Sequence, residues 1–354
     1  MRSLIMTILL STASFIGFTQ AAEKNAERHA YVDAHLHYVN FMQETDGTQK
    51  LLKAMDKAGV EKAWIFGLPV IKKWEESAPR KPRYYLGDEA PLYYYSGTDD
   101  ILARDLLSLP REQRERFAPF ISGINPTDMN AADQIERLIE RYPGLWSGIG
   151  EILTRHDALT GLTKGETPRA DHPALMKVYK LAARHQLPVL LHSNLSSLRE
   201  DEPIYLPELE NALSENPKTR FVLAHAGTSE SIEALQKPMK KLPQILEGLL
   251  ARYPNLSIDL SWSVRDHYLF EGDKGVDAEW LALIKKFPDR FLLGSDKVGR
   301  FAGLDKNLNG YERLLDKLDA DEARKLTRDN ALAVLPARAA GTIALGDEPA
   351  LARQ

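Results

Sequence analysis

Eight short, nearly continuous apolar runs recur along the chain. A strand that is apolar at almost every position is typical of a parallel sheet covered by helices on both faces, whereas a half-solvated sheet alternates apolar and polar residues. The runs therefore predict eight buried parallel strands. They lie at residues 30–34, 62–67, 117–122, 146–151, 187–192, 220–225, 256–261 and 290–295.

Amphipathic segments separate these runs, with apolar residues spaced by three and four positions and several stops at Gly or Pro. The spacing from His192 to His225 is 33 residues, from His225 to Asp259 it is 34, and from Asp259 to Asp296 it is 37. Eight such strand-helix units predict an α/β fold, a single-domain (β/α)8 barrel over residues 30–336, in preference to a doubly wound sheet. The clearest predicted helices cover residues 48–59, 130–144, 172–186, 238–254 and 277–288.

Both ends of the chain differ from this pattern. The N-terminus has an early Arg2, an apolar run over residues 4–18 and then small residues arranged as at a signal-peptidase site. We expect residues 1–21 to be a signal peptide cleaved near Ala21, so that the mature protein is periplasmic or secreted; an uncleaved membrane anchor is the alternative. With no cysteine, the chain can form no disulfide and carry no lipid-modified Cys. Residues 337–354 are expected to form a disordered tail.

Charge and one long insertion limit the classes of partner. The net charge is only −4 and like charges do not form long blocks, which argues against a nucleic-acid partner and favours a small molecule.

The insertion at 67–100 follows the second strand and contains five tyrosines and one Trp. We expect it to be either a lid over the substrate or an aromatic loop packed on the barrel rim.

Candidate metal ligands stand at the ends of the predicted strands. His35 and His37 are one residue apart, so in a strand their side chains point to the same face. Each such residue alone could be an ordinary polar strand end. In a parallel barrel, however, all the strand C-termini open on one face, and together these nitrogen and oxygen donors suit Zn²⁺ or a similar divalent ion. The other candidates are Glu151, His192, His225 and Asp296.

The segments DAHLH, LLHSN, LAHAG and LLGSD, in this order, resemble the metal-dependent amidohydrolase superfamily. The resemblance is to the amidohydrolase-related branch that includes lactonases and aromatic-acid decarboxylases, and it covers nearly the whole mature chain. The segment at 323–336 is similar to the C-terminal helix of that branch. The resemblance implies a distorted barrel in which His35, His37 and His192 bind the metal and Asp296 is both ligand and proton acceptor.

The number of metal ions stays open. With one ion, His225 is uncoordinated and hydrogen-bonds the attacking water or a substrate oxygen. With two ions, Glu151 bridges them, and His192 and His225 hold the second. The run around Glu151 resembles the strand-4 carboxylate of TatD-like and phosphotriesterase-like members, which favours two ions; the alternative is that Glu151 orients a ligand histidine.

These features predict a hydrolase that cleaves a C–O or C–N bond of an ester, lactone or amide with metal-activated water. A non-hydrolytic lyase such as a decarboxylase is the first alternative. A non-catalytic metal-binding or solute-binding barrel is the second, and Asp296 argues against it because a binder needs no proton acceptor.

A cationic cluster near the site would suit a carboxylate-bearing substrate, although ordinary loop charge is the alternative. Asp259 either points into the barrel or caps a hydrogen-bond network. The candidate substrate residues are Arg155, Asn194, Trp262, Arg265, Lys297 and Arg300.

Overall fold

The computed structural model describes residues 29–75, 77, 79–200, 202–235, 239, 241–270, 272, 275–337 and 339. The predicted signal peptide, residues 1–21, and nearly all of the predicted tail lie outside these residues. Among the helices of the described part, none has both the length and the apolar character that crossing a membrane requires.

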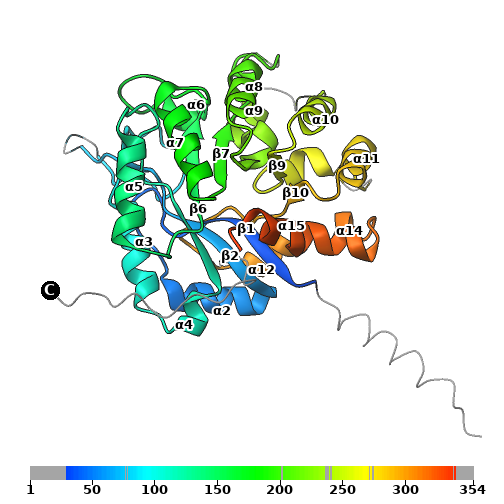
Figure 1. The fold of residues 1–354 in the computed structure, drawn as a ribbon, viewed down its shortest axis with the longest axis horizontal. Coiled ribbons are helices and arrows are strands. Elements are labelled where there is room, and N and C mark those ends of the chain that lie inside the picture. The colour runs from blue at the N-terminus through cyan, green and yellow to red at the C-terminus, as the bar shows by residue number, and fades with distance from the viewer. Residues whose placement is uncertain are drawn as a thin grey trace, which may run out of the picture.

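A sheet of parallel strands, in the order β10-β9-β8-β7-β6-β5-β2-β1-β11, lies at the centre of the molecule (Figure 1). Each of the eight predicted apolar runs contributes to it. Every neighbouring pair in the sheet is parallel, as continuous apolar runs require. The strands are β1 (Tyr31–His37), β2 (Val60–Phe66), β5 (Phe117–Ile121), β6 (Gly148–Thr154), β7 (Val189–Ser193), β8 (Phe221–Leu223), β9 (Leu256–Asp259), β10 (Phe291–Leu292) and β11 (Lys297–Val298).

The last two strands close the barrel: β10 lies within the eighth predicted run, and β11 follows just after the end of that run. β10 pairs with β9, while β11 pairs with β1. Between them, the Ala34 amide donates to the Leu293 carbonyl at 3.0 Å, and the Asp296 amide donates to the His35 carbonyl at 2.8 Å. The eighth strand therefore spans the gap between β9 and β1, and the fold is a distorted single-domain (β/α)8 barrel.

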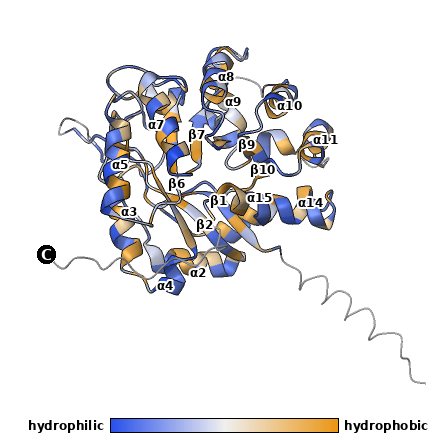
Figure 2. Ribbon diagram, in the orientation of Figure 1, coloured by the Kyte–Doolittle hydropathy of each residue, from blue (hydrophilic) through white to orange (hydrophobic). Residues whose placement is uncertain are grey.

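Helices surround the sheet and turn their apolar sides toward it (Figures 1 and 2). In α5, for example, Ile135 and Leu138 are buried while the opposite face is charged. The five predicted helices are confirmed as α2 (Thr48–Ala58), α5 (Ala131–Arg141), α7 (Pro173–Arg184), α10 (Leu242–Arg252) and α11 (Ala278–Lys286). Further helices are α3 (Thr98–Leu107), α4 (Arg111–Arg114), α6 (Asp157–Thr160), α8 (Leu206–Glu215), α9 (Glu230–Leu235), α12 (Leu304–Asn309), α13 (Glu312–Leu315), α14 (Ala320–Arg324) and α15 (Asn330–Val334).

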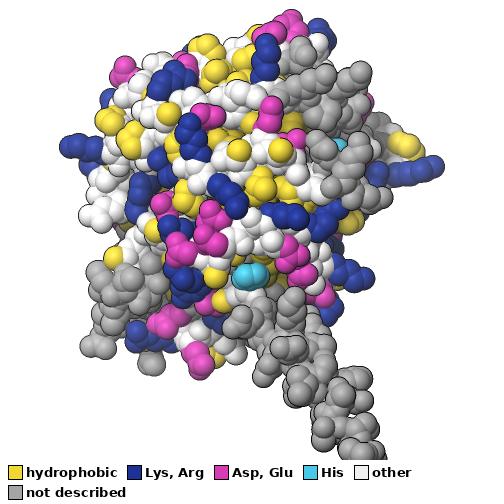
Figure 3. All heavy atoms as spheres, turned by 90° about the vertical axis from the view of Figure 1, so that its right-hand side faces the viewer, with side chains coloured by type: hydrophobic (Ala, Val, Ile, Leu, Met, Phe, Trp, Pro, Cys, Tyr) yellow, Lys and Arg dark blue, Asp and Glu magenta, His cyan; other side chains and the backbone are white. Residues whose placement is uncertain are grey.

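Two apolar clusters hold these layers together. The larger one packs the helices against the outside of the sheet. The smaller one fills the barrel with side chains such as Trp64 and Phe120, whose rings stack 4.9 Å apart. Leu335, just after α15, belongs to the same inner cluster. On the outer face drawn in Figure 3, Lys and Arg side chains are interspersed with Asp and Glu, in keeping with the small net charge.

The insertion after β2 carries a short antiparallel pair, β3 (Val70–Lys72) and β4 (Leu92–Tyr94). Lys72 is buried, and its ammonium group donates to the Tyr85 carbonyl at 2.5 Å and to Asp88 Oδ1 at 2.7 Å. The amide of Phe41, which follows β1, donates to the Tyr84 carbonyl at 3.2 Å. Residues 84–88 are thus tied to β3 within the insertion through Lys72, and to the segment after β1 through the bond between Phe41 and Tyr84.

Candidate metal centre

The six predicted metal ligands meet in one buried basin at the carboxyl ends of the strands. Asp296 Oδ1 lies 3.5 Å from His35 Nε2 and 3.5 Å from His37 Nε2. Glu151 Oε2 lies 3.4 Å from His37 Nε2 on the other side. The second oxygen, Glu151 Oε1, lies 3.0 Å from His192 Nδ1, 3.4 Å from His225 Nε2 and 3.8 Å from His35 Nε2.

Glu151 lies inside its strand and not at its end, where the sequence pattern placed it. β6 continues to Thr154, and its register with β7 shifts between Ile149 and Ile152. Gly150 has a φ of 126°, and a Cβ on it would lie 2.2 Å from the Leu190 carbonyl oxygen. Only glycine therefore fits before Glu151, and this local irregularity presents the carboxylate to the basin.

His225 and Asp296 stand where regular strand structure breaks off. His225 lies in a 3₁₀ turn at Ala224–Gly227 directly after β8, and Asp296 lies between β10 and β11. Their φ angles are 51° and 49°, in the left-handed region that non-glycine residues seldom occupy. Such backbone conformations are concentrated at functional sites. Both side chains enter the basin because the chain turns sharply at these points.

Hydrogen bonds determine which nitrogen of His35 and of His37 carries the proton. His35 Nδ1 donates to Asp259 Oδ2 at 2.9 Å, and His37 Nδ1 donates to the Gly67 carbonyl at 3.0 Å. Because both acceptors lack a hydrogen, the proton of each neutral imidazole sits on Nδ1. The lone pair of Nε2 then points into the basin.

The other two histidines are arranged in the same way. His192 lies between two acceptors, with Nε2 3.1 Å from Asn194 Oδ1 and Nδ1 3.0 Å from Glu151 Oε1, and a neutral ring donates to only one of them. With its proton on Nε2, the Nδ1 lone pair faces Glu151. His225 Nδ1 donates to Ser261 Oγ at 3.0 Å, and that hydroxyl itself donates to Asp259 Oδ2 at 2.5 Å. His225 Nε2 is then the unprotonated nitrogen that faces Glu151.

With these tautomers, four imidazole lone pairs face two carboxylates. Lone pairs and carboxylate oxygens repel each other at these distances unless a cation lies between them. His35 Nε2 is buried and has no hydrogen-bond partner among the described residues. The donor set fits a divalent cation, and the ligand atoms fall into groups that include His35, His37 and Asp296, and Glu151, His192 and His225.

The electrostatics of the basin agree with this arrangement. Burial lowers the pKa of His35, but the Asp259, Glu151 and Asp296 carboxylates outweigh it and raise that pKa to about 10. Burial acts to raise the pKa of Glu151, yet the surrounding histidines hold it well below the usual range. The basin therefore strongly favours positive charge, carried either by a proton or by a metal ion.

Asp259, for which two orientations were open, is the centre of a buried network behind the basin. It accepts hydrogen bonds from His35 Nδ1, from the Ser261 amide and hydroxyl, and from the His225 amide at 3.3 Å. Its side chain is fully buried. One carboxylate therefore orients two of the basin histidines.

His156 is a basin residue that the sequence patterns did not single out. It lies just after β6, is buried, and stacks on His192 with ring centroids 4.2 Å apart. Burial, together with the neighbouring His192, holds its pKa well below the usual range, so the ring is neutral. The sequence feature that could have indicated a basin position for His156 is that it directly follows β6, the fourth predicted strand.

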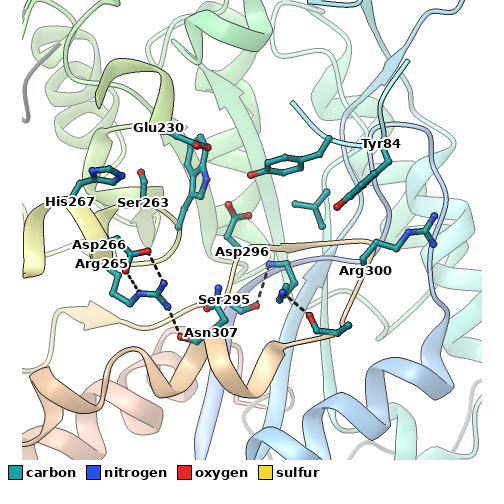
Figure 4. Close-up of a pocket in the computed structure, with 15 residues that line it drawn as sticks. Tyr84, Glu230, Ser263, Arg265, Asp266, His267, Ser295, Asp296, Arg300 and Asn307 are labelled. Carbon is teal, nitrogen blue, oxygen red and sulfur yellow. Dashed lines mark hydrogen bonds and ion pairs between the residues drawn. The ribbon is translucent and has the colours of Figure 1, made fainter. Parts of the chain in front are cut away.

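A cavity of about 500 Å³ opens next to the basin (Figure 4). Asp296, one of the basin residues, is also part of the lining of this cavity. Of the predicted substrate residues, Trp262, Arg265, Lys297 and Arg300 line this cavity.

Arg155 and Asn194 lie elsewhere. Arg155 Nε donates to Glu208 Oε2 at 2.8 Å, and its guanidinium lies 4.1 Å above the Tyr205 ring. Asn194 is fully buried beside His192, where it holds that ring as described above. Neither residue is among the described residues that line the cavity.

Most of the cations around the cavity already have anionic partners. Arg265 is paired with Asp266 at 2.7 Å, as the dashed lines in Figure 4 mark. Arg300 reaches Glu44 at 3.0 Å and Asp46 at 3.3 Å. Lys297 differs, since its ammonium group donates to the Ala302 carbonyl at 2.8 Å.

Solved structures with the same fold come from enzymes of two reaction types. A probable 2-pyrone-4,6-dicarboxylic acid hydrolase from Acinetobacter baumannii, with citric acid bound, matches with a TM-score of 0.53 and 12% identity over 86% of this chain and 98% of that one. The 5-carboxyvanillate decarboxylase of Sphingomonas paucimobilis matches with a TM-score of 0.52 and 15% identity over 87% of this chain and 99% of that one. The 2,6-dihydroxybenzoate decarboxylase from Rhizobium matches with a TM-score of 0.50 and 14% identity over 87% of this chain and 98% of that one.

No curated protein matches the chain significantly. A family model described as amidohydrolase, in contrast, matches residues 32–337, which include every basin residue and all of the barrel strands except Tyr31 at the start of β1. The chain therefore belongs to the amidohydrolase family.

Proposed function

We propose that the protein is a metal-dependent hydrolase that cleaves an ester, lactone or amide bond of a small molecule. The observation that carries this proposal is the buried Nε2 of His35, which has no hydrogen-bond partner among the described residues and lies 3.5 Å from Asp296 Oδ1. A nitrogen lone pair and a carboxylate oriented in this way form part of a cation site.

His35, His37 and Asp296 would hold one ion, and Glu151, His192 and His225 a second. Glu151 turns Oε2 toward His37 and Oε1 toward His192 and His225, which supports a bridging role between two ions. Zn²⁺ is our choice of metal because the ligand atoms are imidazole nitrogens and carboxylate oxygens. When bound, such an ion polarises a substrate carbonyl and lowers the pKa of a coordinated water from about 15.7 to about 7.

The chain's own residues would supply proton transfer and orientation. Asp296 lines both the basin and the large cavity, so its carboxylate is placed to accept a proton from water and return it to the leaving group. Asp259 would keep His35 and His225 in the tautomers that bind metal, and Asn194 would do the same for His192.

A carboxylate-bearing substrate fits the cavity best. The named relatives act on a pyrone dicarboxylic acid, a carboxyvanillate or a dihydroxybenzoate, and one of them has citric acid bound. In this chain, Lys297 would bind the carboxylate, because Arg265 and Arg300 are already paired with carboxylates. Trp262 would contact the body of the substrate.

A decarboxylase is the second candidate function, favoured by the two decarboxylases among the structural relatives. The same ligand set suits both reactions, so the products decide between them.

We also propose that the enzyme acts in the periplasm or outside the cell, on the strength of the N-terminal sequence.

The test is a screen of the metal-loaded protein against lactones, aryl esters, amides and aromatic carboxylic acids. A hydrolase releases a carboxylic acid together with an alcohol or amine, whereas a decarboxylase releases carbon dioxide. Chelator-treated protein is the control, and activity that survives complete metal removal would contradict both candidates.

A further inference from the structure

Two spaces of very different size meet at the candidate metal centre. The large cavity of about 500 Å³ lies outside, and a small space of about 30 Å³ lies among the basin residues His37, Glu151, His192 and His225. A volume of about 30 Å³ accommodates only one or two water molecules. Four residues line both spaces, namely Tyr85, Trp262, Asp296 and Val298.

Tyr85 and Trp262 are the two large side chains of this shared wall. They come from separate parts of the barrel rim, Tyr85 from the insertion after β2 and Trp262 from the loop after β9. The Trp262 ring lies 5.0 Å from the His225 ring and 6.4 Å from the His192 ring. Burial, with Asp296 and Glu230 nearby, raises the pKa of Tyr85, so its hydroxyl is neutral.

Tyr85 is held in this position by its own backbone. Its carbonyl accepts from Lys72 Nζ, which also binds Asp88, and its ring packs edge-on against Phe41 at 6.2 Å. Lys72 is 5% exposed, so these bonds are made away from water. A buried ammonium group thus anchors the segment that presents Tyr85 to the wall.

We propose that Tyr85, together with Trp262, separates the metal basin from the outer cavity and determines which part of a ligand reaches the metal. The inference rests on the proposed function, since it requires metal in the basin. The body of a substrate would lie in the outer cavity, and only its reacting group would pass Tyr85. A chelator would have to pass the same wall.

The experiment measures how fast a chelator removes the metal. Protein loaded with Zn²⁺ is mixed with excess 4-(2-pyridylazo)resorcinol, and the coloured zinc complex is followed over time. In Tyr85→Ala we expect release about tenfold faster than in wild type, the scale on which contacts outside the ligands affect metal sites. Tyr85→Phe keeps the ring and should release zinc at close to the wild-type rate.

Tyr93→Ala is the matched control, because Tyr93 lies on β4 of the same insertion and is 47% exposed. A second pair of variants tests the anchor. Lys72→Met should also accelerate release, while Lys73→Met should not, since Lys73 is exposed and pairs with Glu75 at 3.0 Å. Circular dichroism establishes that each variant is folded.

Zinc content of the wild-type protein, measured first, separates the two hypotheses. Failure of the wild type to hold zinc would overturn the proposed function and this inference with it. Zinc that is held, but released at the same rate from wild type, Tyr85→Ala and Lys72→Met, would overturn only the role of Tyr85. Faster release from Tyr93→Ala to the same extent would likewise contradict it.

Discussion

The Nδ1 atom of His35 lies 2.9 Å from Oδ2 of Asp259, deep in the barrel and away from solvent. This contact determines the chemistry of the basin, because it places the proton on Nδ1 of His35 and leaves Nε2 free to bind metal. The same carboxylate holds Ser261, which in turn orients His225. One buried residue therefore prepares ligands for both proposed ion sites.

Replacement of Asp259 should weaken metal binding without removing a ligand. Asp259→Asn keeps the shape of the side chain but loses the negative charge, and its amide nitrogen cannot accept from Ser261 or from the His225 amide. We expect metal affinity to fall about 10- to 100-fold. Titration with a competing chelator measures it, and Asp133→Asn on exposed α5 is the control. Unchanged affinity would show that Asp259 does not orient the ligands.

Loss of a histidine of the first strand should release the metal from a folded barrel. His35→Ala and His37→Ala each remove a donor at the catalytic rim and leave the apolar barrel filling intact. Metal analysis together with circular dichroism checks both halves of this prediction. His29→Ala, at an exposed histidine outside the basin, should keep its metal. Full occupancy in both basin variants would exclude these residues as ligands.

Asp296→Asn should separate proton transfer from metal binding. In the proposed two-ion arrangement, His35, His37 and the bridging Glu151 still hold the first ion, whereas the basic oxygen of Asp296 is lost. We expect turnover to fall about 10²- to 10⁴-fold with much of the metal retained. The assay uses the best substrate from the screen. Turnover close to wild type with metal bound would transfer the proton-accepting role to His225.

Lys297→Met should act on substrate binding and not on the reaction itself. A hydrogen bond to a charged group contributes roughly 1.5–3 kcal/mol, which corresponds to a rise in KM of about 10- to 100-fold for a carboxylate-bearing substrate. A matched substrate whose carboxylate is replaced by a methyl group should be affected little. Equal loss for the charged and uncharged substrates would show that Lys297 does not recognise the carboxylate.

The N-terminal prediction is tested on protein recovered from the producing cells. We expect the mature chain to begin near Ala22 and to fractionate with the periplasm or the medium. Intact mass and N-terminal sequencing give the answer. An N-terminus at Met1 on the recovered protein would contradict cleavage.

Much of this architecture could be predicted from the sequence, because buried parallel strands and amphipathic helices leave strong local patterns. All eight apolar runs form barrel strands, and the histidines of the run DAHLH meet His192 and His225 as the parallel barrel requires. What these patterns could not give was the direction of individual side chains. Arg155 follows β6 but turns to Glu208, a partner 53 residues away that no local pattern reveals.

The features that the sequence analysis missed depend on contacts between distant segments. His156 enters the basin by stacking on His192 of another strand, and Tyr85 is anchored through Lys72 and Phe41. Glu151 was expected at a strand end, but the shift of register beside Gly150 places it inside β6. Such positions are determined by tertiary packing, which apolar periodicity does not encode.

The most direct test of the metal centre is the metal content per chain, measured by mass spectrometry on wild type and on a double variant, His35→Ala with Glu151→Gln. The double variant removes a donor from each proposed ligand group. We predict about two divalent ions per chain in the wild type, in line with two complete ligand groups, and loss of both in the variant. Wild-type protein that holds no divalent ion after incubation with excess Zn²⁺, or a variant that holds as much as the wild type, would contradict a metal centre in this basin.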